Sequence, residues 1–421
     1  MNRLRTLIIA ENLPYPTLKG GDLRTWQNVN ALMRIGEVGV FGLCSNDPRG
    51  AEGVREGMAF WRTSTDPALA HPPKQDRILA ARAWFLSPTG HPADLYYSCG
   101  AAGEIAALIY EFKPHIIVIE RLWLYRYIER IKRFNCRVIL DSHNVETALY
   151  RQIGDSICGD DLQARLMRET LPSRTETIER QAMHAVDQIW VCSERDRGLV
   201  KQLYGPRVSI HVVPNGVNLD SYKTGPVGND PYPRDAEPTG RSLIFPAMFA
   251  YPPNSKAALF LVDEIFPLLA KLTADFQLLL IGSMPTAAIL KAAQKDSRIV
   301  VTGAVRDMRR YFAAASAMVV PLFEGGGTRF KILEAFAAAV PVISTAKGAE
   351  GLHVKHGTHL LLAERPGEFV DAVKRLWADE RLSSRLVANA RALMKRRYSW
   401  DVASRRIDKA VGELSVSMNV Q

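Results

Sequence analysis

The 421-residue sequence contains no apolar run near the roughly 18 residues that a membrane-spanning helix needs. The N-terminal apolar stretch stops at Glu11, which is too short for a signal peptide and predicts a first strand instead. Cysteine is scarce and scattered, with an odd number of residues and no C-x-x-C pair. The five are Cys44, Cys99, Cys136, Cys158 and Cys192. This pattern excludes a disulfide framework and a cysteine zinc site, so we expect free thiols in the cytoplasm.

Two common ligand-binding motifs are also missing. The loop after the first strand has no G-x-G-x-x-G fingerprint, which argues against a nicotinamide or flavin cofactor. No Asp-x-Asp pair occurs anywhere in the chain.

The net charge is +10, from 54 Lys and Arg against 44 Asp and Glu, which indicates an anionic partner. Because no basic run is interleaved with aromatics, we do not expect that partner to be nucleic acid.

Continuous apolar segments alternate with amphipathic ones along most of the chain, which predicts an α/β fold with parallel sheets. Residues 223–241 hold four prolines and three glycines, a composition typical of a linker. We therefore predict a Rossmann-like domain over 1–222, a linker over 223–241 and a second Rossmann-like domain over 242–397. A C-terminal helix and tail over 398–421 would complete the chain.

The segment 321–345, PLFEGGGTRFKILEAFAAAVPVIST, predicts a strand, a glycine-rich turn, a helix and a second strand. Such a turn directs free backbone N–H groups outward at the positive end of a helix dipole, which favours an anion. Thr328 is expected to cap the helix, with Arg329 at its first position and Lys331 at its third. Lys331 and Glu334 share one helical face, which we expect to meet solvent and ligand. A diphosphate would suit the cations and a ribose the carboxylate; the alternative is an ordinary turn with a solvated Lys–Glu pair.

In the first domain, two predicted strands end in polar residues. The strand 116–119 is followed by Glu120 and Arg121, and the next strand ends in D-S-H-N at 141–144. Ligands of open α/β sheets bind beyond the carboxyl ends of the strands. His143 is therefore a candidate site residue; the alternative is a loop histidine whose nitrogens bond to the backbone.

Taken together, the motifs resemble those of the family-4 glycosyltransferases of the GT-B fold, in that family's order. They are GGDLR, DSHN, VCSERD, VPNGVN, YPPN, TGAVRD, EGGGTRFKILEAFAAAVPVIST and GAEG. The GGGTR-x-K-x-L-E pattern resembles a bacterial cell-envelope or exopolysaccharide subset. The resemblance implies two Rossmann-like domains facing across a cleft, with the C-terminal helix crossing back to the first domain.

The resemblance also implies a function. It implies a metal-independent, retaining transfer of a sugar from a nucleotide-diphosphate sugar to a glycan or lipid-linked acceptor, in envelope polysaccharide synthesis and without a cofactor. A lipid-linked acceptor and the positive charge would suit contact with the anionic inner face of the cytoplasmic membrane. Three alternatives stay open: a sugar-nucleotide epimerase, a phosphorylase, or a non-catalytic protein that binds sugar nucleotides or polyanions.

The resemblance assigns roles to individual residues. The catalytic candidates are His143, Arg329 and Lys331. The donor-binding candidates are Gly20, Gly21, Asn254, Gly325, Gly326, Gly327, Thr328 and Glu334, with Arg24 and Glu324 as further possibilities. No metal ligand is assigned. In one departure, many family members have two glutamates eight positions apart, whereas Gly326 stands at the first of these positions here and Glu324 lies two residues earlier.

Overall fold

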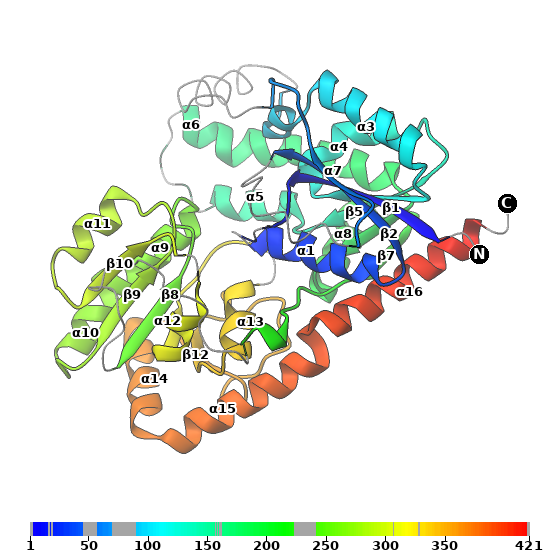
Figure 1. Ribbon diagram of the computed structural model, residues 1–421. Coiled ribbons are helices and arrows are strands. Elements are labelled where there is room, and N and C mark those ends of the chain that lie inside the picture. Colours follow the sequence, from blue (N-terminus) through cyan, green and yellow to red (C-terminus); the bar gives the residue numbers. More distant parts are fainter. Residues whose placement is uncertain are drawn as a thin grey trace. The chain divides into compact units, whose positions relative to one another are not determined.

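The structure is a computed structural model that forms two compact units (Figure 1). It describes residues 3–15, 17, 20–44, 57–69, 90–155, 157, 159, 162–222, 241–305, 307–326 and 329–418. Unit 1 comprises Met1–Asn215 and Asp401–Gln421, and unit 2 comprises Gly216–Trp400. The predicted linker 223–241 lies outside the described residues, apart from its last residue.

Unit 1 is built on a seven-stranded sheet in which every pair of neighbouring strands is parallel. The order β3-β2-β1-β4-β5-β6-β7 reverses direction between β1 and β4, which is the switch point of a doubly wound sheet. Continuous apolar sequence explains the parallel pairing, because both faces of such strands are covered. The strands are β1 (Leu4–Asn12), β2 (Gly36–Cys44), β3 (Phe60–Thr63), β4 (Ile116–Glu120), β5 (Arg137–Ser142), β6 (Gln188–Val191) and β7 (Ser209–Val212).

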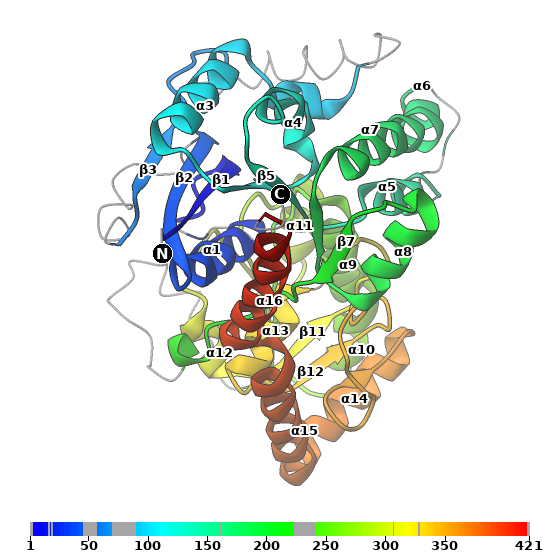
Figure 2. The ribbon, with the colours of Figure 1, turned by 90° about the vertical axis from the view of Figure 1, so that its right-hand side faces the viewer.

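Helices cover both faces of this sheet (Figures 1 and 2). Leu7 and Ile9 of β1 pack in one buried cluster with α3, α4, α7 and α8, and Ile8 packs in the other with α1 and α16. The helices are α1 (Gly20–Met33), α3 (Cys99–Phe112), α4 (Tyr125–Ile131), α5 (Glu146–Asp155), α6 (Leu162–Arg165), α7 (Leu171–Ala185), α8 (Glu194–Tyr204) and α16 (Trp400–Met418).

The last helix, α16, belongs to unit 1 from Asp401 onward. Its buried residues Ile407, Ala410, Val411 and Leu414 have the spacing of one helical face and join the same apolar cluster as α1. The Gln188 side chain of β6 donates to the Ala410 carbonyl at 2.9 Å. Burial of this apolar stripe therefore holds the end of the chain against the first sheet.

Unit 2 repeats the doubly wound pattern with six parallel strands in the order β10-β9-β8-β11-β12-β13. Its switch point lies between β8 and β11. The strands are β8 (Ser242–Pro246), β9 (Gln277–Ile281), β10 (Ile299–Gly303), β11 (Ala315–Val320), β12 (Val342–Ser344) and β13 (Leu361–Leu362). The helices are α9 (Pro252–Phe260), α10 (Phe266–Ala270), α11 (Ala287–Ala293), α12 (Arg309–Ala314), α13 (Phe330–Ala337), α14 (Pro366–Ala378) and α15 (Glu380–Leu393).

The segment 216–222 belongs to unit 2, whereas the sequence boundaries assigned it to the first domain. Two hydrogen bonds account for this placement. The Val217 N–H donates to the Tyr398 carbonyl at 2.9 Å, and the Trp400 indole donates to the Gly216 carbonyl at 3.2 Å. These contacts hold the segment just before the linker against the body of unit 2.

The structure bears on two predictions about the whole chain, which concern membrane-spanning helices and cysteines. Over the part of the chain that the structure describes, no helix combines the length and apolar character that crossing a membrane requires. The described cysteines, Cys44, Cys99, Cys136 and Cys192, are free thiols, and Cys158 lies outside the described residues.

Candidate functional site

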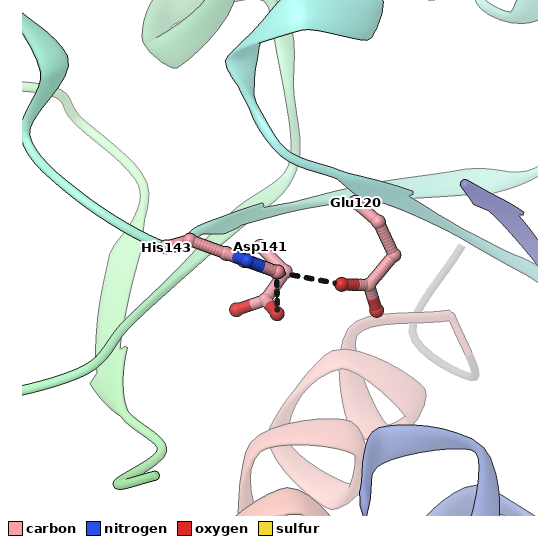
Figure 3. A group of neighbouring side chains, drawn as sticks. All are labelled: Glu120, Asp141 and His143. Carbon is pink, nitrogen blue, oxygen red and sulfur yellow. Dashed lines mark hydrogen bonds and ion pairs between the residues drawn. The ribbon is translucent and has the colours of Figure 1, made fainter. Parts of the chain in front are cut away.

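Three polar side chains meet at the carboxyl ends of β4 and β5 in unit 1 (Figure 3). The Nε2 atom of His143 lies 2.9 Å from Glu120 Oε2 and 3.3 Å from Asp141 Oδ2. Its Nδ1 atom accepts a hydrogen bond from Nε of Arg121 at 3.2 Å. Both ring nitrogens therefore have side-chain partners, and the alternative of a histidine bonded to the backbone is wrong.

Arg24 of α1 supplies a positive charge beneath this group. Its side chain is 1% exposed. Its Nε donates to Asp141 Oδ2 at 2.8 Å and its Nη2 to the other oxygen, while Nη1 donates to the Val213 carbonyl and to Asn215 Oδ1, both at 2.8 Å. All three guanidinium nitrogens are used inside unit 1. The prediction that Arg24 contacts the donor is therefore wrong, because its side chain is buried and all its bonds lie in the interior of unit 1.

The pKa values of the two buried carboxylates shift in opposite directions, because only Asp141 pairs with the Arg24 cation. Burial acts to raise the pKa of Asp141, but the charge of Arg24 and a hydrogen bond from His143 hold it well below its usual range. Burial, together with the charge of Asp141, raises the pKa of Glu120. Asn28 Nδ2 bridges the pair, at 3.1 Å from Glu120 Oε1 and 2.8 Å from Asp141 Oδ2. Arg24, Asn28, Glu120, Asp141 and His143 are called the His143 network below.

Part of this network has the spacing of a metal site. Ligand-type atoms of Glu120, Asp141 and His143 all lie within 4.8 Å of one another. Both oxygens of Asp141, however, already accept N–H donors from Arg24, and one also accepts from Asn28. A divalent cation at this point would repel the guanidinium at close range. These residues therefore do not fit a resident metal.

Gly21, at the start of α1, allows Arg121 to approach closely. A Cβ atom on Gly21 would lie 1.5 Å from Nη2 of Arg121. Arg121 has a φ of 78°, which is unusual for a residue other than glycine, and its Nη1 donates to Glu11 Oε2 at 2.9 Å. Through Arg121, Gly21 is thus linked to the orientation of the His143 ring.

The substitution Gly21→Ala is expected to lower the free energy of unfolding by roughly 1–2 kcal/mol, because Arg121 must leave Glu11 and His143. Urea denaturation would measure this loss, and the imidazole NMR signals of His143 should shift with it. Gly103→Ala in α3 is the matched control, because nothing lies within 4 Å of its added Cβ. If the two variants were equally stable and the His143 signals unchanged, the close approach would have no structural weight.

In unit 2 the glycine-rich turn leads into α13, but the helix begins later than the sequence predicted. Phe330 is the first helical residue and Arg329 takes the cap position, so Lys331 is at the second position instead of the third. Gly325 has a φ of 104°, and a Cβ there would lie 2.9 Å from Nη2 of Arg329. Gly327 and Thr328 lie outside the described residues. Arg329 makes no side-chain capping bond, and its guanidinium folds back to the Gly326 and Glu324 carbonyls.

Lys331 is enclosed where the sequence predicted it to face solvent. Its Nζ atom lies 3.2 Å from Asn254 Oδ1 and 4.3 Å from the centre of the Phe245 ring. Burial, reinforced by the charge of Arg329 and opposed by that of Glu334, lowers the pKa of Lys331 to about 7. The side chain is half-buried among groups from α9 and β8. A cation held in this way has lost much of its water, so an arriving anion gains more from it than from an exposed lysine.

Glu334 lies one turn further along α13 and accepts a hydrogen bond from another part of unit 2. The Tyr222 hydroxyl donates to its Oε1 atom at 2.9 Å. Burial raises the pKa of Glu334, while the Tyr222 hydrogen bond and the charge of Lys331 act against that rise. Tyr222, Asn254, Arg329, Lys331 and Glu334 are called the Lys331 cluster below.

The two cations of the Lys331 cluster form no ion pair with a described residue. Among the residues that the structure describes, no carboxylate lies within ion-pair distance of Arg329 or Lys331. The Nε atom of Arg329 is buried and has no hydrogen-bond partner within the described part of the chain. Because desolvated cations without an ion-pair partner are costly, an anion bound here would stabilise both of them.

Comparison with known proteins agrees with this arrangement. A sequence model described as "Glycosyl transferases group 1" matches residues 240–379, which include the Lys331 cluster apart from Tyr222. A second, "Glycosyl transferase 4-like domain", matches residues 29–216, which include most of the His143 network. The chain belongs to the family-4 glycosyltransferases.

Individual relatives are distant. The phosphatidyl-myo-inositol mannosyltransferase of Mycobacterium leprae is 29% identical over 210 residues, covering 49% of this chain and 54% of that protein. The chain thus spans about half the length of this curated relative. Among solved structures, sucrose-phosphate synthase of Thermosynechococcus elongatus has a TM-score of 0.71 at 18% identity, covering 99% of this chain and 100% of that one. The Anabaena protein HepE in complex with UDP-glucose has a TM-score of 0.67 at 13% identity, covering 97% and 99%. These likenesses show the GT-B fold.

As a family-4 glycosyltransferase, the chain departs from the usual pair of glutamates. Gly326 stands at the first position, and its carbonyl bonds to Arg329. The carboxylate of Glu324, the candidate replacement, accepts from Lys256 Nζ at 2.7 Å. It is therefore already paired, although with a lysine that is 53% exposed. Membership of the GGGTR-x-K-x-L-E subset stays a prediction.

Four residues of the His143 network and the Lys331 cluster were not among the predicted site residues: Asn28, Glu120, Asp141 and Tyr222. Glu120 and Asp141 carried a signal, because they lie at the carboxyl ends of buried strands, where ligands bind. Tyr222 carried none, since it ends a short turn 112 positions before its partner Glu334.

Proposed function

We propose that this chain transfers a sugar from a nucleotide-diphosphate sugar to a glycan or lipid-linked acceptor, with retention of configuration and without a metal. The observation that carries the proposal is the pair of cations Arg329 and Lys331, which follow a glycine-rich turn and have no ion-pair partner among the described residues. A diphosphate supplies the missing negative charge.

The chemistry of sugar transfer suits such a pair. As the bond between the anomeric carbon and the diphosphate oxygen breaks, negative charge builds up on the departing diphosphate. Cations that are already in place stabilise this charge more strongly in the transition state than in the ground state. An approaching diphosphate also favours the protonated form of Lys331, whose pKa is lowered to about 7. In this proposal Arg329 and Lys331 do the electrostatic work that a metal ion performs in other enzymes.

Other residues of the Lys331 cluster hold the rest of the donor. Asn254 fixes the Lys331 ammonium through its 3.2 Å hydrogen bond. Glu334 would accept hydrogen bonds from the ribose hydroxyls, and backbone N–H groups of Gly325 and Gly326 would contact the diphosphate, together with Gly327 and Thr328.

In unit 1, His143 enters the proposal as a sugar-binding residue, and Gly20 and Gly21 as residues that approach the phosphate or sugar. Both nitrogens of His143 already bond within unit 1. A sugar hydroxyl must therefore replace Arg121 or Glu120 as a hydrogen-bond partner of the ring.

The acceptor proposal draws on the relatives and on charge. The name of the Mycobacterium leprae relative specifies an inositol phospholipid, which supports a lipid-linked acceptor, and the HepE complex with UDP-glucose supports a nucleotide-sugar donor. The net charge of +10 suits contact with anionic lipid at the inner face of the cytoplasmic membrane. A cytoplasmic location and a role in envelope polysaccharide synthesis belong to the same proposal.

A panel of nucleotide sugars tests it. The correct donor should raise the apparent melting temperature by mass action. At a donor concentration of about 100 times its Kd, the free energy of unfolding should increase by about 2.7 kcal/mol. Transfer to a lipid-linked glycan should follow, should persist in EDTA, and should give a product with the anomeric configuration of the donor. No stabilisation by any nucleotide sugar would refute the proposal.

One alternative has a specific observation behind it. Because Gly326 stands where many relatives have a glutamate, a non-catalytic protein that binds sugar nucleotides would show the stabilisation without the transfer. An epimerase would convert the donor without an acceptor, and a phosphorylase would require inorganic phosphate.

A further inference from the structure

We propose that Tyr222 is a positioning residue that holds the Glu334 carboxylate in the orientation that recognises the ribose of the nucleotide. This inference rests on the proposed function, because it takes Glu334 as the ribose contact. It adds a residue from outside the glycine-rich turn and α13 to that site.

A hydrogen bond joins the Tyr222 hydroxyl to the Glu334 carboxylate. The Tyr222 hydroxyl donates to Oε1 of Glu334 at 2.9 Å. Among the described side chains, no other donates to this carboxylate. One oxygen is thus fixed by the phenol, which sets the rotation of the carboxylate and leaves Oε2 for a ligand donor. A carboxylate held at one oxygen is pre-organised for a second hydrogen bond.

Tyr222 itself is held in place by neighbouring residues of unit 2. Its ring meets the buried Phe312 edge to face, with ring centres 6.1 Å apart and planes at 67°. The preceding residue is fixed by Arg309, whose Nη1 donates to the Ser221 carbonyl at 3.4 Å. Further back, Val217 bonds to the Tyr398 carbonyl. The phenol therefore cannot follow Glu334 freely, and its position constrains the carboxylate.

The charges around Tyr222 and Glu334 also support this role. Burial raises the pKa of Tyr222, and the charge and hydrogen bond of Glu334 raise it further, so the phenol keeps its proton and can only donate to the carboxylate. The charged groups that face Tyr222 are Glu334, Asp307 and Arg309, and Lys331 faces Glu334 on α13. Since burial alone favours the neutral acid, the phenol helps to keep Glu334 ionised and able to accept from hydroxyl groups.

The test compares ribose with deoxyribose. UDP, GDP and ADP are first screened by calorimetry, and the one that binds is compared with its 2′-deoxy and 3′-deoxy forms in the wild type and in Tyr222→Phe. We expect Tyr222→Phe to weaken binding of the ribonucleotide about tenfold, the range for a hydrogen bond that involves a charged group. Binding of at least one deoxy form, which lacks a hydroxyl that Glu334 receives, should change by less than about twofold. A purely structural defect would weaken all forms equally.

Two variants complete the design. Tyr398→Phe is the control, because it also removes a buried phenol from unit 2, one that accepts from the His353 N–H at 2.8 Å. It should leave ribose discrimination unchanged. Glu334→Gln should lose the discrimination, and adding Tyr222→Phe to it should weaken ribonucleotide binding no further, because both changes act on one contact.

The outcomes separate the inference from the proposed function. If Glu334→Gln loses ribose discrimination while Tyr222→Phe keeps it, the positioning role is overturned and the donor site stands. If none of the three nucleotides binds, or if Glu334→Gln keeps the wild-type discrimination, the ribose role of Glu334 fails and the inference fails with it.

Discussion

Replacing Lys331 with methionine is expected to slow sugar transfer strongly and to make the protein more stable. Transfer should fall by about 10²–10³-fold, the usual cost of removing one preorganised group that stabilises developing charge. Stability should rise because Lys331 is half-buried and has no ion-pair partner among the described residues. Methionine fills a similar volume without the cost of a desolvated charge. The gain should be roughly 1–3 kcal/mol, of the kind seen when a functional site holds strain.

The pH dependence of this gain follows from the direction of the pKa shift. The pKa of Lys331 is lowered from 10.5 to about 7 in the folded protein. Between these values the unfolded chain binds more protons, so wild-type stability rises with pH across that window. The destabilising contribution is complete below pH 7 and is relieved as the pH approaches 10. The advantage of Lys331→Met should therefore be largest near pH 6 and should shrink toward pH 9.

Urea denaturation at pH 6 and pH 9, beside transfer assays, would check both effects. Lys295→Met is the matched control, because Lys295 is 65% exposed and pairs with Asp263 at 2.9 Å. It should change stability by less than about 1 kcal/mol and leave transfer intact. If Lys331→Met kept full transfer, or lost stability at pH 6, the assignment of Lys331 as a half-buried cation that binds the donor diphosphate would be wrong.

Lys331 also shows where prediction from the sequence ends. The parallel α/β units follow from continuous apolar strands that alternate with helices, and the glycine-rich turn before α13 follows from its composition. The sequence predicted an exposed Lys331, however, because helical spacing indicates which residues share a face and not what covers that face. Asn254 and Phe245, which enclose its ammonium, lie 77 and 86 positions earlier in the chain.

The His143 network shows the same limit in unit 1. The rule that ligands bind at strand ends identified His143, but not the ring's partners. Arg24 and Asp141, 117 positions apart, are joined by the pairing of β1, β4 and β5 and by the packing of α1 on the sheet. The GGDLR motif of the family resemblance makes Arg24 a possible ligand contact. Its burial depends on tertiary packing, which no local pattern contains.

Arg24→Met is the second change with a large expected effect, here on stability. It leaves Asp141, which is 0% exposed, as a buried carboxylate without its cation, and removes four hydrogen bonds. Breaking one side of a buried pair typically costs about 3–5 kcal/mol. Urea denaturation at pH 7 should show a loss in this range. Arg34→Met is the matched control, because its ion pair with Asp401 is exposed on both sides and should be worth less than about 1 kcal/mol.

The pH dependence of stability distinguishes a loss of charge balance from a simple packing defect. In the wild type the pKa of Asp141 is depressed, so the stability that it contributes is present above its unfolded pKa and is lost as the pH falls through the folded value. Without Arg24, burial raises that pKa and the carboxylate accepts a proton readily. The stability gap between Arg24→Met and the wild type should therefore narrow between pH 7 and pH 4. Adding Asp141→Asn should recover part of the loss at pH 7, since no buried charge then remains unpaired. A gap that stayed constant with pH, with no recovery in the double variant, would mean that Arg24 acts through its volume and not through its charge.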